Sequence, residues 1–316
     1  VDSLGGRYIT AEDVGTDVND MENIYLESQF VTGVHQVHGG SGDPAPFTAY
    51  GALQALMAAM RYSALGGGKR VRAFLVKAVG DLFGVPAAQS LAVGSAIELL
   101  HAYSLIHDDL PAMDDALTRR GKPACHKEFD EAVAILAGDA LQALAIEILA
   151  RPELDVDDAT SRALSLGLVR AAGPAGMCGG QMIDLRAAEL NLDLAGIRQL
   201  QDLKTGALIR FACEAGCILG QATDDERQAL LAYGDKLGLA FQISDDLLDV
   251  RGDQAAVGKD VGHDADKATF VATLGIDGAE SELKSLHMEA STLLDRFSDR
   301  ATLLRTLFGF VIDRSY

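Results

Sequence analysis

Residues 105–117 read LIHDDLPAMDDAL, where an apolar run meets four aspartates within eight positions. The run repeats its apolar side chains every three or four positions, which predicts a buried helix over residues 87–107. Pro111 lacks a backbone N–H and clashes with the preceding turn, so the helix should break there. The break lets Asp114 and Asp115 turn back toward Asp108, and the stretch therefore predicts a helix that ends in a cluster of carboxylates.

The same helical spacing recurs from about residue 49 to residue 316, with Gly- and Pro-rich stretches between the segments. The predicted helices cover residues 49–64, 71–83, 87–107, 128–150, 159–172, 196–219, 224–251, 277–296 and 300–313. No segment of this region alternates as a strand does. The pattern therefore predicts an all-α fold, one large helical bundle.

Charge and composition exclude several classes of protein. The 316 residues include 46 acidic and 27 basic side chains, a net charge of −19, so we expect no nucleic-acid partner. The four cysteines show no CxxC pairing, which predicts reduced thiols in a soluble, cytoplasmic protein. No basic-then-apolar leader opens the sequence, and Asp139 and Glu147 interrupt its most apolar run, which predicts no membrane insertion.

Clustered carboxylates repel one another and therefore predict a bound cation. Two unit charges about 4 Å apart repel by roughly 4 kcal/mol at an effective dielectric constant of about 20. A second cluster, AFQISDDLLDV at residues 240–250, places Gln242, Asp245 and Asp249 on one helix face. Either cluster alone is also compatible with a solvated helix end, but two clusters within apolar helices favour Mg²⁺, Mn²⁺ or Ca²⁺. The predicted metal ligands are Asp108, Asp109, Asp114, Asp245 and Asp249.

Basic residues alternate with these acidic clusters along the chain. The stretch GGGKRVR at residues 66–72 places cations after flexible glycines at a helix start, where free N–H groups favour anions. The cations are Lys69, Arg70, Arg72, Arg119, Arg120, Lys204, Lys259 and Lys267. A lone cation is usually a solvated surface charge, whereas this alternation predicts a pocket that holds two phosphorylated ligands through metal ions and direct cations.

The complete series of motifs resembles the trans-prenyl diphosphate synthases of the short-chain farnesyl and geranylgeranyl type. The motifs are GGGKRVR, LIHDDLPAMDD, RRGKPACH, AGDAL, GGQMIDL, KTGALI and AFQISDDLLDVRGD followed by GKD. The resemblance covers about residues 57–316 and implies an all-α bundle of the isoprenoid synthase type around a deep cavity. It also implies Mg²⁺ or Mn²⁺ ions, a homodimer, and condensation of isopentenyl diphosphate with allylic diphosphates.

The resemblance assigns a role to each motif residue. Asp108, Asp114 and Asp245 bind the ions that hold the allylic diphosphate, which Arg119, Lys204 and Lys259 also contact. Oxygens of Thr205 and Gln242, with the Lys204 carbonyl, stabilise the allylic cation. Isopentenyl diphosphate is held by Lys69, Arg72, His101 and Arg120. The family usually has proline where this chain has Ala73.

Product length depends, by the same resemblance, on the cavity floor beneath the first aspartate motif. Ser104 lies one helical turn, roughly 6 Å, from Asp108, with the bulky Tyr103 beside it. These two residues, with Pro111 and Ala112 inside the motif, are similar to the bacterial farnesyl synthases. The sequence therefore predicts a C15 product, and replacing Tyr103 by Ala should lengthen it.

The first 48 residues differ in composition from the rest of the chain. Up to about residue 55 they resemble a fragment of leucine and phenylalanine dehydrogenases, in which Asp13 would match an acidic active-site residue. No GxGxxG strand-to-helix turn follows, so we interpret residues 1–48 as an appended segment and 49–316 as the synthase domain. Three alternatives remain open: a geranylgeranyl diphosphate synthase, a non-catalytic synthase-like subunit, and a terpene cyclase, which needs no isopentenyl-binding residues.

Overall fold

The computed structural model describes residues 10, 16–32, 34–38, 45–251 and 269–313. The chain divides into two compact units, Val1–Ala59 and Met60–Tyr316. The boundary predicted at residue 48 stays a prediction.

The first unit contains one short capped helix and the start of a long one. Helix α1 (Val18–Tyr25) begins after Asp17, whose carboxylate accepts hydrogen bonds from the backbone N–H groups of Asn19 and Asp20. A single parallel bridge pairs Thr10 with Val31. Helix α2 (Ala45–Leu65) crosses from this unit into the second.

The second unit is a helical bundle, as the sequence predicts. Its helices are α3 (Val71–Leu82), α4 (Ala87–Asp108), α5 (Cys125–Glu128), α6 (Glu131–Ala150), α7 (Asp158–Ala172), α8 (Met177–Leu185), α9 (Ala187–Leu190), α10 (Leu194–Gln201), α11 (Ala207–Leu219), α12 (Asp224–Arg251), α14 (Phe270–Leu294) and α15 (Thr302–Ile312). Short 3₁₀ turns occupy Pro152–Leu154 and Asp295–Ala301, and a π-helical turn, η4, occupies Asp202–Gly206.

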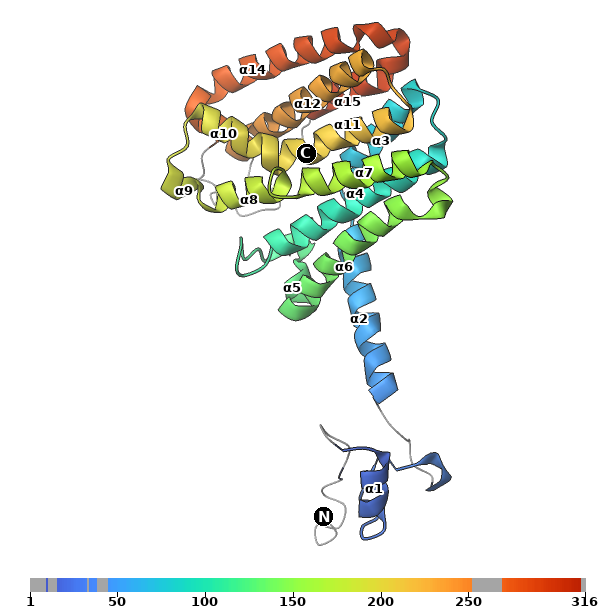
Figure 1. Ribbon diagram of the computed structural model, residues 1–316. Helices are drawn as coiled ribbons and strands as arrows, with labels where there is room; N and C mark the ends of the chain where they lie inside the picture. The colour runs from blue at the N-terminus through green and yellow to red at the C-terminus, as the bar shows by residue number, and fades with distance from the viewer. Residues whose placement is uncertain (1–9, 11–15, 33, 39–44, 252–268, 314–316) are drawn as a thin grey trace. The chain divides into compact units, whose positions relative to one another are not determined.

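Helix α4 lies at the centre of the part of the bundle that carries the first aspartate motif. It packs against α6 on one side and against α3 and α11 on the other, and α12 packs between α11 and α14 (Figure 1). Its buried face carries Val93, Ile97 and Leu100, which join the hydrophobic core. Several helices begin with an acidic cap; Asp130, for example, accepts from the N–H of Val133 at 2.7 Å.

Several local features differ from the sequence-based expectation. Helices α8 and α9 lie between residues 172 and 196, where no helix was predicted, because the glycines of residues 173–180 look like a connecting stretch. Residues 196–219 form no continuous α-helix, because the turn η4 interrupts α10 and α11. Two strands, β1 (Thr118–Arg119) and β2 (Lys122–Pro123), pair antiparallel, although no strand was predicted. Arg120 and Gly121 between them have φ of 54° and 74°, the geometry of a tight hairpin turn, and strands of two residues are too short to show alternation.

Helix α6 is the one helix of the described chain that is long and apolar enough to cross a membrane by length and composition alone. A third of its most apolar window, 33%, is buried inside the protein, where it packs against α4 and α7. Its exposed face carries Ile135, Leu136 and Ile146 beside Asp139 and Glu147. The absence of membrane insertion stays a prediction.

Candidate active site

A cavity of about 350 Å³ lies between α4, α8, η4 and α11. Many of its lining residues are among those that the sequence predicts: Arg72, His101, Tyr103, Ser104, Asp108, Lys204 and Thr205. Apolar side chains also line it: Met113, Met177, Met182, Leu185 and Leu208. The structure therefore brings the first aspartate of the first aspartate motif, one predicted diphosphate-binding lysine and the predicted length-determining residues into one cavity.

The aspartate loop folds back over the end of α4, as Pro111 predicts. The N–H of Asp114 donates to the carbonyl of Asp108 at 3.0 Å. Burial raises the pKa of the Asp108 carboxyl; Lys204 opposes this shift and Asp114 adds to it. The prediction that Asp115 also returns toward Asp108 is wrong, because the Asp115 carboxylate lies 3.2 Å from the ammonium nitrogen of Lys127. Asp108 and Asp114 are therefore the pair that shares excess negative charge at this site.

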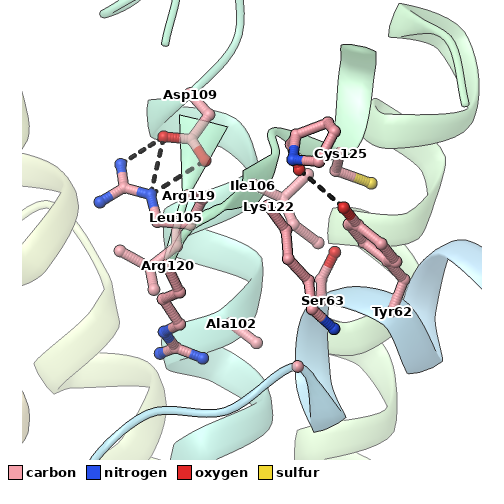
Figure 2. A pocket seen from close by; sticks show the side chains of 12 residues that line it. Tyr62, Ser63, Ala102, Leu105, Ile106, Asp109, Arg119, Arg120, Lys122 and Cys125 are labelled. Atoms are coloured by element: carbon pink, nitrogen blue, oxygen red, sulfur yellow. Dashed lines mark hydrogen bonds and ion pairs between the residues drawn. The ribbon is translucent and has the colours of Figure 1, made fainter. Parts of the chain in front are cut away.

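Asp109 points in another direction and is buried in an ion pair with Arg119 (Figure 2). Its carboxylate is only 2% exposed, and both of its oxygens accept from the Arg119 Nε, at 2.9 and 3.0 Å. The pair anchors the β1–β2 hairpin to the end of α4. The hydroxyl of Tyr62 donates to the Pro123 carbonyl at 2.9 Å and holds the other strand. Metal binding by Asp109 and diphosphate binding by Arg119 stay predictions, and each would compete with this ion pair.

The π-helical turn brings Lys204 and Thr205 to the cavity. Lys204 donates to Asp184 of α8 at 2.5 Å. Helix α8 approaches this turn so closely that a Cβ at Gly180 would overlap the backbone of Lys204. A π turn shifts backbone hydrogen bonds out of the α-helical register and is often found at functional sites. Nothing in the apolar spacing of 196–219 signals the turn, so the sequence analysis missed it.

Gln242 connects the π turn to the second aspartate motif on α12. Its amide oxygen lies 3.4 Å from the Thr205 hydroxyl, and its amide nitrogen donates to Asp246 at 3.3 Å. Asp246 is buried and also accepts from the N–H of Phe270 at 2.7 Å; burial raises its pKa to about 6. Asp246 thus connects α12 to α14. Of the predicted metal ligands on α12, Asp245 is half-buried and Asp249 is exposed.

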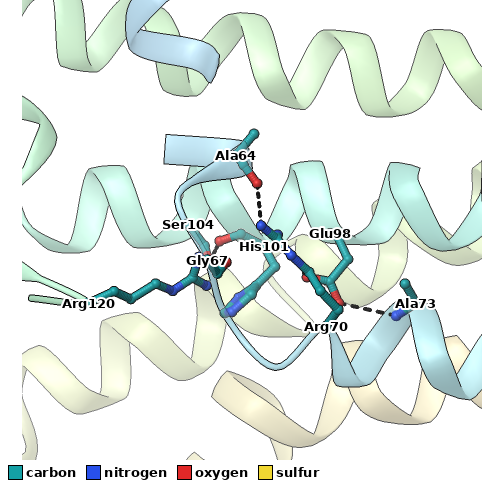
Figure 3. Close-up of polar contacts among 8 residues, drawn as sticks. All are labelled: Ala64, Gly67, Arg70, Ala73, Glu98, His101, Ser104 and Arg120. Carbon is teal, nitrogen blue, oxygen red and sulfur yellow. Dashed lines mark hydrogen bonds and ion pairs between the residues drawn. The ribbon is translucent and has the colours of Figure 1, made fainter. Parts of the chain in front are cut away.

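The basic motif begins α3 and faces α4. Arg70 has a left-handed backbone (φ 51°) and donates to the Ala64 carbonyl at 2.6 Å, while its other nitrogen lies 3.5 Å from Glu98 (Figure 3). Glu98 also accepts from the N–H of Ala73 at 3.2 Å. Proline has no such donor, so the alanine at this position gives Glu98 a partner that the usual family residue could not. Lys69, the residue before Arg70, is exposed.

Arg72 and His101 form the half-buried part of this basic region. Burial lowers the pKa of Arg72 to about 10, and its buried Nε has no hydrogen-bond partner among the described residues. Burial, with Arg72 and Arg120, lowers the pKa of His101 well below its usual value. Arg120 donates to the Gly67 carbonyl at 2.6 Å (Figure 3). Arg70, Arg72 and Arg120 lie together with Glu98 as the nearby carboxylate, and this excess of positive charge suits an anionic ligand.

Two polar residues of α8 contribute to the cavity without having been assigned roles. Gln181 donates to Asp108, and Asp184 binds Lys204. Both lie in the motif GGQMIDL, three residues apart and thus on one helix face, which is the signal that could have found them.

Three of the predicted residues, Asp13, Lys259 and Lys267, lie outside the described residues. Within the described ranges, no group of three or more His, Cys, Asp or Glu side chains is gathered to hold a metal ion.

The arrangement is that of an enzyme acting on phosphorylated substrates with an apolar part, and comparison with known proteins identifies its family. The polyprenyl synthetase family model matches residues 53–301, and the chain belongs to that family. The family match begins at residue 53, close to the end of the segment that resembles dehydrogenases. That resemblance remains an interpretation.

Particular relatives share most of the chain. It is 45% identical to a farnesyl diphosphate synthase of Haemophilus influenzae over 82% of this chain and 88% of the relative. The crystal structure of an FPP/GFPP synthase from Zymomonas mobilis has a TM-score of 0.74 and 47% identity, covering 82% and 88% of the two chains. A geranyltransferase from Helicobacter pylori, complexed with magnesium and isoprenyl diphosphate, has a TM-score of 0.71 and 33% identity, covering 82% and 87%. The all-α isoprenoid synthase fold is therefore confirmed.

Proposed function

We propose that this protein is a Mg²⁺-dependent prenyltransferase that condenses isopentenyl diphosphate with dimethylallyl and geranyl diphosphate to give farnesyl diphosphate. The observation that carries the proposal is a single cavity lined by Asp108, Lys204, Arg72 and His101 together with apolar side chains and Tyr103. Two diphosphate groups and one growing hydrocarbon chain fit such a lining. The family match and the identity to farnesyl diphosphate synthases support the same activity.

The allylic diphosphate would bind at Asp108, Asp114, Lys204 and Arg119. Lys204 is held by Asp184 at 2.5 Å, so an incoming diphosphate would compete for a cation that is already oriented. Loss of the diphosphate leaves an allylic cation, which the Thr205 hydroxyl and the Gln242 amide face as neutral dipoles. Neutral dipoles stabilise the cation without forming a bond to it.

Isopentenyl diphosphate would bind at Lys69, Arg72, His101 and Arg120. Arg72 has an unsatisfied buried Nε, and its neighbour His101 is neutral because its pKa is lowered. A bound diphosphate would satisfy the arginine and remove the repulsion between the cations around the histidine. After the new bond forms, the departing diphosphate is the base that we propose for the final proton.

The donors present at the aspartate loop fit Mg²⁺. Asp108 and Asp114 offer only oxygen atoms, and their mutual repulsion contributes to the raised pKa of Asp108. Asp108, Asp114 and Asp245 are the residues that would hold the ions. When bound, Mg²⁺ would supply charge neutralisation of the diphosphate and of the leaving group. The Helicobacter pylori relative is described as a complex with magnesium and isoprenyl diphosphate, which supports this assignment.

We further propose a soluble, cytoplasmic homodimer with no stable membrane insertion. The exposed apolar side chains Ile135, Leu136 and Ile146 occupy the face of α6 that α4 does not cover. A second copy of the chain is the partner that we propose for that face, because a soluble oligomer commonly pairs like surfaces. Sedimentation measurements with Leu136→Glu against wild type test it.

The activity is tested by incubating the purified chain with Mg²⁺, isopentenyl diphosphate and, separately, dimethylallyl, geranyl or farnesyl diphosphate. Product lengths are read by mass spectrometry. Farnesyl diphosphate as the end product supports the proposal. Geranylgeranyl diphosphate would instead support the geranylgeranyl alternative, which a relative named geranylgeranyl pyrophosphate synthase, 41% identical over 264 residues, keeps relevant. No condensation would favour the non-catalytic subunit.

A further inference from the structure

Tyr103 is fixed at both ends within the cavity. It lies five residues before Asp108 on α4, or roughly 7.5 Å along the helix axis. Its ring packs edge-to-face on His107, with centroids 5.0 Å apart and planes at 81°. Its hydroxyl lies 3.6 Å from the Cys178 sulfur on α8. The side chain therefore bridges two helices on opposite sides of the cavity.

The ring end is held by a contact that extends to α6. The Nε2 atom of His107 lies 3.0 Å from the carbonyl oxygen of Ile135. Gly138 makes room for the imidazole, because a Cβ there would overlap the ring. His107 can therefore move little, and the ring of Tyr103 keeps its position against it.

The hydroxyl end is held by Cys178, which among the described residues is the hydrogen-bond partner of the Tyr103 hydroxyl outside α4. Of the four cysteines, all in the described part of the chain, Cys178 is the exposed one, and it lines the cavity. Burial and the contact with Cys178 raise the pKa of the Tyr103 phenol, so its hydroxyl stays protonated at neutral pH and can donate to the sulfur. Without this contact the phenol could turn away from α8.

We propose that Cys178 is a specificity-determining residue: it holds the hydroxyl of Tyr103 across the cavity and so stops the growing chain at C15. This inference rests on the proposed prenyltransferase function. Tyr103 supplies the bulk that meets the end of the chain, and Cys178 keeps that bulk in place. The contact involves none of the residues proposed to bind diphosphate, so it should affect chain length rather than the first condensation.

The test measures the ratio of C20 to C15 products for wild type, Cys178→Ala, Tyr103→Phe and the double variant. Each single variant breaks the same contact from one side, and each should raise the ratio at least tenfold. The double variant should exceed the stronger single variant by less than twofold, because the contact can be lost only once. Cys178→Ser keeps a hydrogen-bonding partner and should stay within twofold of wild type.

Cys217→Ala is the matched control, because Cys217 is buried on α11 and does not line the cavity. Its product ratio should equal that of wild type. The rate of geranyl diphosphate formation from dimethylallyl diphosphate should change less than threefold in every variant, whereas a merely structural role would lower all rates together.

The outcomes separate this inference from the function on which it rests. A folded wild type that makes no prenyl product would overturn the proposed function. A wild type that makes farnesyl diphosphate, with Cys178→Ala and Tyr103→Phe both within twofold of its product ratio, would overturn the role of Cys178 alone. Circular dichroism on each variant shows whether it is folded, and if Cys178→Ala is not, Tyr103→Phe decides the question.

Discussion

Removing Asp109 and removing Arg119 should lower the unfolding free energy by different amounts. The two losses should also be strongly coupled, because the two side chains form one ion pair. The Asp109 side chain is 3% exposed and that of Arg119 is 29% exposed. Arg119→Met would leave a nearly buried carboxylate without a partner, so we expect a loss near the upper end of the range for broken buried pairs, about 5 kcal/mol. Asp109→Asn leaves a partly hydrated guanidinium, and we expect a loss of about 3 kcal/mol.

The double variant should lose much less than the sum, because no unpaired charge remains buried. We therefore expect a coupling energy of about 3 kcal/mol from a double-mutant cycle. Guanidinium chloride unfolding of the four proteins measures it, with Lys77→Met and Asp81→Asn as a control cycle. Lys77 and Asp81 form an exposed i, i+4 pair whose coupling should be about 0.5 kcal/mol. A coupling energy at Asp109–Arg119 no larger than that of the control would refute the anchoring role.

Three further changes test other parts of the structure. Gly180→Ala should lower activity at least tenfold and destabilise the protein by about 1–3 kcal/mol, because its Cβ would separate α8 from Lys204. Gly309→Ala is the control and should be neutral, because a Cβ there meets nothing within 4 Å. Equal effects of the two substitutions would contradict the close approach of α8. Burial depresses the pKa of His101 in the folded protein, so its contribution to stability is present above pH 6.5 and is lost as the pH falls. Relative to His101→Asn, wild type should therefore lose unfolding free energy as the pH falls below 6.5, and a pH-independent difference would refute this. Ala73→Pro should destabilise the protein by about 1 kcal/mol by removing the N–H that Glu98 accepts, whereas Ala73→Ser should not; equal unfolding free energies for both would argue against that hydrogen bond.

The sequence was sufficient for most of the long helices, because their apolar side chains repeat at helical spacing over long segments. It did not predict α8, whose first half is rich in glycine. The end of α4 was also predictable, since Pro111 acts locally and Asp114 returns to Asp108 as expected. The residues predicted to determine chain length and the lysine predicted to bind diphosphate followed from family motifs, and the structure places them in one cavity.

Features that depend on tertiary contacts were not predictable in the same way. The π turn around Lys204 follows from the close approach of α8, and the apolar pattern of residues 196–219 does not differ from that of a continuous helix. Asp109 and Asp108 are adjacent and chemically identical, yet only the fold shows that one faces Arg119 and the other the cavity. The contact between Tyr103 and Cys178 joins residues 75 positions apart, which no local pattern reveals.

The central claim, that one cavity binds two diphosphate substrates, is tested most directly by a crystal structure with Mg²⁺, isopentenyl diphosphate and an unreactive thio analogue of dimethylallyl diphosphate. The account predicts the allylic diphosphate beside Asp108 and Lys204, isopentenyl diphosphate beside Arg72 and His101, and an allylic chain directed toward Tyr103. Electron density for either diphosphate away from these residues, with the cavity filled only by solvent, would contradict it.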